Sequence, residues 1–341
     1  MRASIILCLV LIGVPAHARA QSAVIVQLSP EGDALAQQLG VSPAELAADV
    51  KTRVDDAYQT ANISEFLEAF TDATSFSARG IGVDYASAPR GLIAGVAASL
   101  AAAGDERIRS EERPTAGVAA NLAVMIGMNL REWGHPRWTV FANGFYRNAA
   151  TEQLDGNVTS MGAHVQYHLI PPSADAGVKT MMRWIGLSMT SGIELTRWDL
   201  SSGGSTLSTD FTVGGGANTA PITLDATGRL DLTSTAVTVP LEATTGIRIA
   251  LLATLYVGVG VDFTVGRSTI DSSLDGTLRS SDNRDLGTVA ITAAGTNNGS
   301  PGTARVLAGA QVNLWKLKLF AQINASQAPA ASIGFGLKFV Q

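Results

Sequence analysis

Residues 158–170 alternate strictly between apolar and polar side chains, and this pattern constrains the fold more than any other feature of the chain. One series is Met161, Ala163, Val165, Tyr167 and Leu169, and the interleaved series is Ser160, Gly162, His164, Gln166 and His168. Successive side chains of a β-strand point to opposite faces, so this period of two predicts a strand with one apolar and one polar face. The pattern recurs in later segments, so most of the chain is expected to form such strands.

We expect ten long strands, near residues 89–102, 115–130, 136–149, 156–170, 182–199, 233–248, 250–267, 303–315, 316–327 and 331–341. An ordinary globular strand has ~5–6 residues, whereas a tilted strand that crosses a bilayer needs ~9–11. Strand length therefore favours an all-β, antiparallel transmembrane barrel over a soluble β-sandwich, in which the same alternation would occur.

The number of strands depends on two long polar segments, 200–232 and 268–302. Residues 206–213 with 222–232 are able to form one further hairpin and 268–302 another, which raises the expected count to about 12–14. Otherwise these segments and 103–114 are long loops, whereas the turns at Trp315-Lys316 and near Ile249 are short. Outer-membrane barrels have short periplasmic turns and long outer loops, so we expect the long segments on the cell exterior.

The first twenty residues have the form of an export signal. Arg2 precedes an apolar run from Ile5 to Val14, and a small-x-small cleavage site follows at 18–20, so the mature chain is expected to begin near Gln21. The apolar run is about half of the ~20 residues that a spanning helix needs. The only cysteine, Cys8, lies in this segment, so the mature chain has no thiol for a disulfide, a metal or catalysis.

Residues 21–75 are expected to form a short helical segment ahead of the barrel, which we place at 76–341. Ser29, followed by a proline, and Gly40 frame one helix, Ser42 and Glu45 form a capping box for the next, and Asn62 begins a third. This segment is expected to plug the lumen or to lie beneath it in the periplasm.

Without residues 1–20 the chain has a net charge of −7, from 22 basic and 29 acidic residues. An acidic exported protein without a basic cluster is a poor candidate for binding nucleic acid, so no nucleic acid is expected among its partners. The partners that we expect are outer-membrane lipids, the barrel-assembly machinery and a small-molecule solute that the sequence does not identify. No cofactor is expected.

Three segments resemble known outer-membrane proteins. The final strand alternates Ile333, Phe335, Leu337 and Phe339 with small or polar residues, and it resembles the C-terminal strand by which Gram-negative outer-membrane barrels are recognised for assembly, although two residues follow Phe339. Residues 75–89, with Arg79-Gly-Ile-Gly-Val-Asp-Tyr, resemble the N-terminal region of FadL-like transporters, and residues 161–201 resemble uncharacterised outer-membrane barrel families. The FadL-like resemblance implies a plugged barrel that moves hydrophobic compounds.

The polar faces of the strands are expected to line the lumen, because a charge that faces lipid near the bilayer midplane costs about 2–4 kcal/mol. Both signs of charge occur there, so strong ion selectivity is not expected, and opposite charges that meet across the lumen would narrow the pore. The candidate lumen-lining residues are Arg147, His164, Gln166, His168, Glu194, Asp262, Arg305, Gln311 and Asn313.

Neither a metal site nor a catalytic residue is expected. His164 and His168 lie four positions apart, which along a strand is ~13 Å, too far to share one metal ion. A lipid hydrolase would need a serine activated by histidine, and Ser160 and Ser188 are polar-face candidates for that role. No motif resembles such an enzyme family, so we expect the chain not to be an enzyme.

The sequence thus predicts a porin-like barrel in the outer membrane of a Gram-negative cell, exported by its signal peptide, that serves as a channel or transporter for small molecules, hydrophobic ones included. One alternative is a structural or surface-adhesion barrel that presents residues 200–232 and 268–302 outside the cell. A second alternative is an outer-membrane lipid hydrolase.

Overall fold

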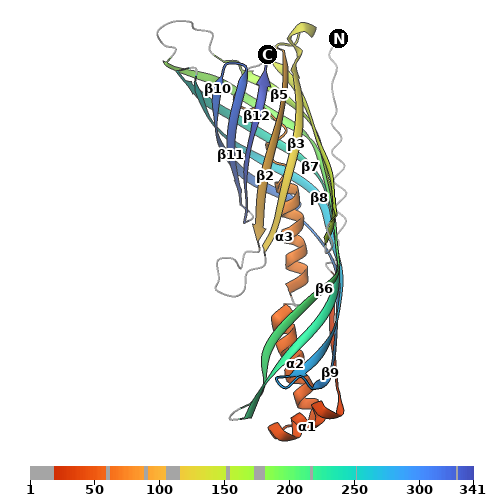
Figure 1. Ribbon diagram of the computed structural model, residues 1–341. Coiled ribbons are helices and arrows are strands. Elements are labelled where there is room, and N and C mark those ends of the chain that lie inside the picture. The colour runs from red at the N-terminus through yellow and green to blue at the C-terminus, as the bar shows by residue number, and fades with distance from the viewer. Residues whose placement is uncertain are drawn as a thin grey trace.

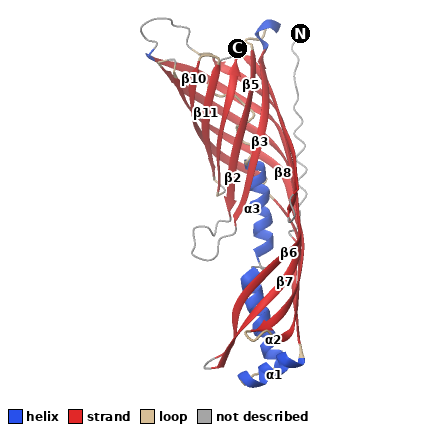
Figure 2. Cartoon of the chain, in the orientation of Figure 1, coloured by secondary structure: helices blue, strands red, loops and turns tan. Residues whose placement is uncertain are grey.

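The computed structural model describes residues 19–58, 62–87, 91–104, 116–150, 154–172, 181–215, 218–250, 252–327 and 329–341. Within these ranges one antiparallel sheet holds twelve strands, beside three α-helices and a 3-10 helix (Figures 1 and 2). The predicted signal segment up to residue 18, the core of loop 103–114 and most of link 171–181 lie outside the described residues. The strands are β1 (Arg19–Leu28), β2 (Leu92–Gly104), β3 (Ala116–Asn129), β4 (Trp138–Ala150), β5 (Leu154–Ile170), β6 (Met182–Gly215), β7 (Asn218–Ile249), β8 (Ala253–Ser280), β9 (Asp285–Asn298), β10 (Gly302–Leu314), β11 (Leu317–Ser326) and β12 (Ala330–Val340).

Ten of the twelve strands close into a ring, because β8 has two partners on one of its edges. Its first part, 253–263, pairs with β10, and its second part, 267–279, pairs with β9. The other edge of β8 pairs with β7 throughout. The ring contains β2 to β8 and β10 to β12, and these strands contain the ten segments predicted from the sequence. The predicted fold class is confirmed, and the sheet has the expected strand number.

The outer face of the ring is apolar and its inner face is polar. Val124, Val259 and Phe335 are each about 60% exposed on the outside, and large apolar side chains occupy the outward positions of the ring strands. On the inside, hydroxyl, amide and charged side chains are buried. In a soluble protein the apolar side chains face inward and the polar ones face water. Here the order is reversed, because the outer face contacts lipid and the polar side chains meet one another in the filled interior. The barrel is therefore of the transmembrane type.

Residues 200–232 and 268–302 form paired strands and not loops, as the higher of the expected strand counts requires, but these strands project from the ring instead of adding to it. β6, β7 and β8 continue far beyond the ring as paired strands, and β9 and β1 add to them. Ser and Thr dominate these residues and suggested loops, but the inward positions remain apolar at Val213, Ile222 and Leu224. We call this part of the molecule, residues 21–58, 197–235 and 266–300, the extension.

The described part of the chain begins with a strand, ahead of the predicted helices, which is a second correction. β1 pairs with β9 over its full length, so its alternating Val24 and Val26 belong to the sheet of the extension. Helices α1 (Pro30–Leu39), α2 (Pro43–Tyr58) and α3 (Ile63–Phe76) follow. None of the helices among the described residues is long and apolar enough to cross a membrane.

The first two helices have the predicted ends. Ser29 accepts a hydrogen bond from the Gly32 N–H at 3.2 Å, and Gly40 ends α1 with a φ of 77°. In the capping box the Ser42 N–H donates to Glu45 at 2.7 Å and the Glu45 N–H donates to Ser42 Oγ at 3.2 Å. The bonds from Ser42 lower the pKa of the Glu45 carboxyl.

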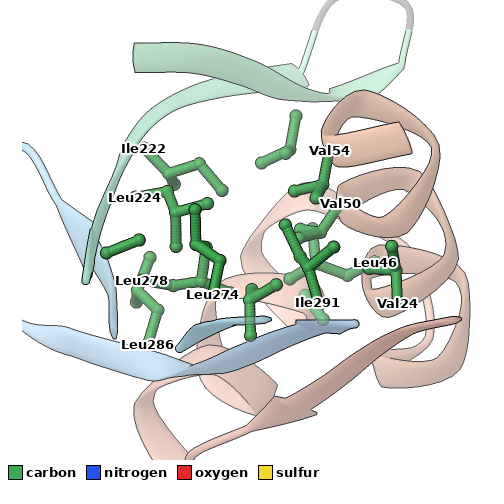
Figure 3. Close-up of a cluster of buried hydrophobic side chains, with 14 residues drawn as sticks. Val24, Leu46, Val50, Val54, Ile222, Leu224, Leu274, Leu278, Leu286 and Ile291 are labelled. Atoms are coloured by element: carbon green, nitrogen blue, oxygen red, sulfur yellow. The ribbon is translucent and has the colours of Figure 1, made fainter. Parts of the chain in front are cut away.

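The helices α1 and α2 pack on the concave face of the extension and give it a core of its own (Figure 3). Val50 and Val54 of α2 are fully buried against Leu224 and Leu278 of the sheet. α3 lies on the barrel side of α2 and reaches into the ring (Figure 1). The molecule is therefore elongated, with the barrel at one end and α1 at the other.

Substitution of Leu224 by Ala is expected to loosen the extension and to leave the barrel folded. Leu224 is fully buried in the core of the extension, and a Leu→Ala cavity costs ~2–5 kcal/mol. Hydrogen exchange should increase in β1, α1 and α2, while the barrel keeps its heat-modifiable gel mobility. Thr227→Ala, on the outward face of the same strand, is the matched control. Equal exchange in both variants would contradict a core of this kind.

Candidate functional site

Most of the candidate lumen residues lie buried on the inner face of the ring. These are His164, Gln166, His168, Glu194, Asp262, Arg305, Gln311 and Asn313. Arg147 differs, because it is exposed near the end of β4, beyond the last residue of β4 that pairs with β3. The lumen-facing side chains therefore meet each other and the N-terminal segment, not open water.

The second half of α3 and the residues after it, 77–87, fill the ring, while the first half of α3 packs on the extension. We call the whole segment, 63–87, the plug. α3 contacts β2, β3, β7, β8 and β9, which surround it. Gly117 and Ala119 on β3 present little side chain inward, and a Cβ at Gly117 would meet the α3 backbone at Ala69 and Phe70 at 2.5 Å. Small inward residues on β2 and β3 thus leave the space that the helix occupies.

A buried cluster of ion pairs joins the plug to four strands of the wall. Arg79 of the plug pairs with Glu194 on β6 and, through Nε, with Asp262 on β8 at 3.0 Å. Arg305 on β10 donates to the same Asp262 oxygen at 2.9 Å and pairs with Glu242 on β7. Asp262 is shared by both guanidinium groups, so the plug and the wall form one charge network.

A second ion pair fixes the end of the plug. Lys338 on β12 donates to Asp84 Oδ1 at 2.8 Å, and both side chains are buried. The same oxygen accepts the N–H groups of Ala86 and Ser87, each at 3.1 Å. Gln311 on β10 donates to Ser87 Oγ at 3.1 Å. The plug is therefore held at both ends of its path through the ring.

Sequence reasoning missed the partners in these pairs, namely Arg79, Asp84, Glu242 and Lys338, as site residues. Glu242 and Lys338 occupy inward positions of strands that were predicted, so the alternation would have found them. Arg79 and Asp84 lie in a segment without periodicity, and only its FadL-like resemblance marked it.

The two histidines have different neighbours. His168 Nδ1 lies 2.8 Å from Ser188 Oγ, while His164 Nε2 lies 3.5 Å from Glu194. Ser160 accepts a hydrogen bond from Asn121 at 3.0 Å and does not bond to His164. Only Ser188 therefore has a histidine partner, and the residues described hold no carboxylate that pairs with His168. They also hold no group of three His, Cys, Asp or Glu side chains placed to bind a metal ion.

The wall has a slot between β3 and β4. These strands pair only between residues 124–129 and 139–144, whereas β4 continues to pair with β5 up to Ala150. A groove of about 440 Å³ follows the slot, lined by inner-face Asn121 and outer-face Leu122. The groove therefore follows a stretch of the wall in which the edges of β3 and β4 are not hydrogen-bonded to each other.

The outward face of β6, β7 and β8 changes from apolar to polar at one level. Leu195, Val237 and Val265 are aligned neighbours across the three strands, and two positions further lie Arg197, Thr235 and Arg267. Beyond this line the outward positions of β7 and β8 hold only polar residues: Thr233, Asp231, Arg229, Thr227 and Asp225, and Thr269, Asp271, Ser273, Asp275 and Thr277. Hydrocarbon therefore ends at this line, and the extension stands in water.

Replacing Arg79 by Met is expected to lower the free energy of unfolding of the barrel. The change leaves Asp262 and Glu194 buried without their partner in the plug, a loss of ~3–5 kcal/mol. Urea titration in detergent, with gel mobility as the readout of the folded barrel, measures this loss of free energy. The exposed Arg197, which pairs with Asp199 at 2.8 Å, gives the control variant Arg197→Met, for which little change is expected. A midpoint unchanged by Arg79→Met would show that the pairs do not hold the plug.

Comparison with known proteins places the chain in a family. Among solved structures it resembles the translocator domain of autotransporter NalP from Neisseria meningitidis (TM-score 0.33, 13% identity, 85% of this chain and 98% of that chain). It also resembles Ail, the attachment invasion locus protein of Yersinia pestis (TM-score 0.26, 10% identity, 73% and 97%), and the Pseudomonas putida toluene transporter TodX (TM-score 0.25, 9% identity, 78% and 96%). At these scores the likeness carries no inference about function. No curated protein matches the sequence. The Lsa36-like family profile matches residues 19–341, and the chain belongs to the Lsa36-like family.

Proposed function

We propose that this protein is a surface-adhesion protein of the outer membrane, in which a plugged barrel anchors the extension outside the cell. The observation that carries the proposal is the aligned change of outward residues at Arg197, Thr235 and Arg267. Past that line β8 continues to Ser280, roughly 40 Å at ~3.3 Å per residue. The plug occupies the lumen, so the surface available to a partner is this structured projection.

The direction of the projection follows from the connections. β7–β8 and β10–β11 are joined by very short turns at the end of the ring where the C-terminus lies, and the extension leaves the opposite end. Short turns face the periplasm in outer-membrane barrels, so the extension faces outward. α1 and α2 then lie outside the cell and not in the periplasm. Export by the predicted signal peptide and assembly through β12 belong to the same proposal.

The charge of the extension indicates the chemistry of its partner. The extension holds fourteen acidic and seven basic residues. Its net charge of −7 equals the net charge of the whole chain after residue 20. A surface of this sign attracts cationic regions of a partner and accelerates encounter, most strongly at low ionic strength. We therefore propose a partner with a basic binding region.

Labelling of single cysteines tests the topology, because the chain after residue 20 has none. Thr206→Cys lies on the exposed part of the extension and His135→Cys in the exposed β3–β4 turn. A membrane-impermeant maleimide applied to intact cells should label Thr206→Cys and spare His135→Cys. Both should react in lysed cells. The reverse pattern would overturn the orientation.

Attachment of producing cells to a cultured cell monolayer tests adhesion. Cells with the protein should attach several-fold more than cells without it, because the extension supplies a binding surface. The variant Asp225→Asn/Asp271→Asn/Asp275→Asn removes three exposed charges of the extension and should lose most of that gain, whereas the matched Asp→Glu variant should keep it. Surface labelling without any gain in attachment would reject the adhesion role.

A second candidate function is the passage of small apolar molecules, and the slot between β3 and β4 favours it. Strand edges that stay unpaired at membrane depth are tolerated where they line a cavity, and this slot adjoins a groove of about 440 Å³. The plug lies across the straight path through the ring, so a lateral route into the lipid at the slot would bypass it.

Uptake of a radiolabelled aromatic hydrocarbon by producing cells tests this route. Asn121→Phe fills the groove and should reduce uptake at least several-fold, because the side chain enters the slot. Val124→Phe, on the outer face where β3 and β4 are paired, should leave uptake unchanged. Equal uptake by both variants and by cells without the protein would exclude the route.

A further inference from the structure

A cavity of about 510 Å³ opens at the short-turn end of the ring, opposite the extension. It is formed by the β3–β4 turn, the ends of β5 and β7, the start of β6 and the last described part of the plug. Ala86 of the plug and His168 of β5 lie in its lining, and His168 is held by its Nδ1 contact with Ser188 at 2.8 Å. The end of the plug thus forms part of the wall of this cavity.

Four arginines line the cavity: Arg131, Arg137, Arg183 and Arg248. Arg183 and Arg248 are half-buried, and Arg131 and Arg137 are exposed at its rim. Among the residues that the structure describes, no carboxylate lines the cavity or pairs with any of the four guanidinium groups. This concentration of unpaired positive charge contrasts with the acidic extension at the other end.

The inner two arginines face each other across a strand pair. Arg183 on β6 is the direct partner of Arg248 on β7 in the ladder. Partners in a ladder have Cβ atoms ~4.5–5.5 Å apart, and like charges in this position destabilise the sheet. Two guanidinium groups at this spacing repel each other until an anion lies between them.

The hydrogen bonds of these two side chains are also incomplete. Arg183 Nε is buried and has no partner among the described residues. Within the described parts of the chain, Arg248 donates only to the carbonyl oxygen of Ala86 at 3.4 Å and to Thr254 Oγ1 at 3.5 Å, both long for such bonds. Several N–H donors therefore point to one small volume without strong acceptors.

We propose that this cavity binds a phosphate group, carried by a soluble phosphate ester or by the headgroup of an anionic phospholipid. Guanidinium forks match the oxygens of phosphate in a bidentate way, and a charge near −2 satisfies two facing arginines. The volume lies in the range of small-ligand pockets, ~300–1,000 Å³. Both sources present the same chemistry at this end of the barrel.

The test uses the full-length protein in a phosphate-free maltoside detergent. Samples with inorganic phosphate are compared with samples that hold chloride at the same ionic strength. Phosphate is expected to raise the temperature at which the folded gel mobility is lost. Arg183→Gln removes the repulsion, so it should raise that temperature without phosphate and weaken phosphate binding, measured by calorimetry, at least tenfold. Arg229→Gln, an exposed substitution in the extension, should change neither quantity.

A second arm identifies the source of the phosphate. Nanodiscs of phosphatidic acid are compared with nanodiscs of phosphatidylcholine, again for the wild type and Arg183→Gln. Stabilisation by soluble phosphate supports a free phosphate ester, and stabilisation by phosphatidic acid alone, lost in Arg183→Gln, supports a lipid headgroup. No stabilisation in either arm, or equal stabilisation of wild type and Arg183→Gln, overturns the proposal.

Discussion

The structure depends on the closure of backbone hydrogen bonds around the ring. In hydrocarbon every backbone polar group needs a partner within the protein, so the strands at membrane level must form a closed sheet. β8 shows where that requirement ends. Its edge passes from β10 to β9 between Phe263 and Arg267, at the level where the outward residues become polar. Beyond this level, on the side of the extension, the sheet is free to leave the ring, because water can hydrogen-bond to the backbone groups of an unpaired strand edge.

The same closure creates an interior that the strands alone do not fill. Several inward residues of β2 and β3 are small, which makes room for α3, while β6, β7, β8 and β10 each place one buried charged residue inside the ring: Glu194, Glu242, Asp262 and Arg305. Arg79 completes the second group: without it, Glu194, Asp262 and Glu242 would share a single guanidinium group, that of Arg305. The plug and the ring therefore specify each other, since Glu194 and Asp262 gain the Arg79 guanidinium group only when the chain passes through the ring at one position.

The part of the fold that lies in the membrane follows closely from the sequence, whereas the rest follows less closely. Alternation identified the ten ring strands, and the caps at Ser29, Gly40 and Ser42 identified two helices, because both signals are local. Strands and loops both remained open for the Ser- and Thr-rich segments of the extension, because a strand with a polar outward face and a loop have similar compositions. The projection of these strands beyond the ring was not predicted. β1 was missed because it is short and stands beside a signal-like segment. In the site, inward charges such as Glu194 and Arg305 follow from strand parity, whereas Arg79 and Asp84 do not, since their positions depend on how the plug threads the ring.

The extension is joined to the membrane anchor without a flexible linker, and this has a mechanical consequence. β6, β7 and β8 cross the level of Arg197, Thr235 and Arg267 as continuous paired strands, and the ladder of β7 with β8 has no register shift along its length. The one irregularity of β6 beyond this level lies at Gly203–Ser205. A pull on the extension by a bound partner therefore acts on three paired strands together and passes into the wall of the barrel. Because α2 packs on these strands and is followed by α3, the same pull also reaches the plug, whose only covalent link to the extension is the chain between α2 and α3.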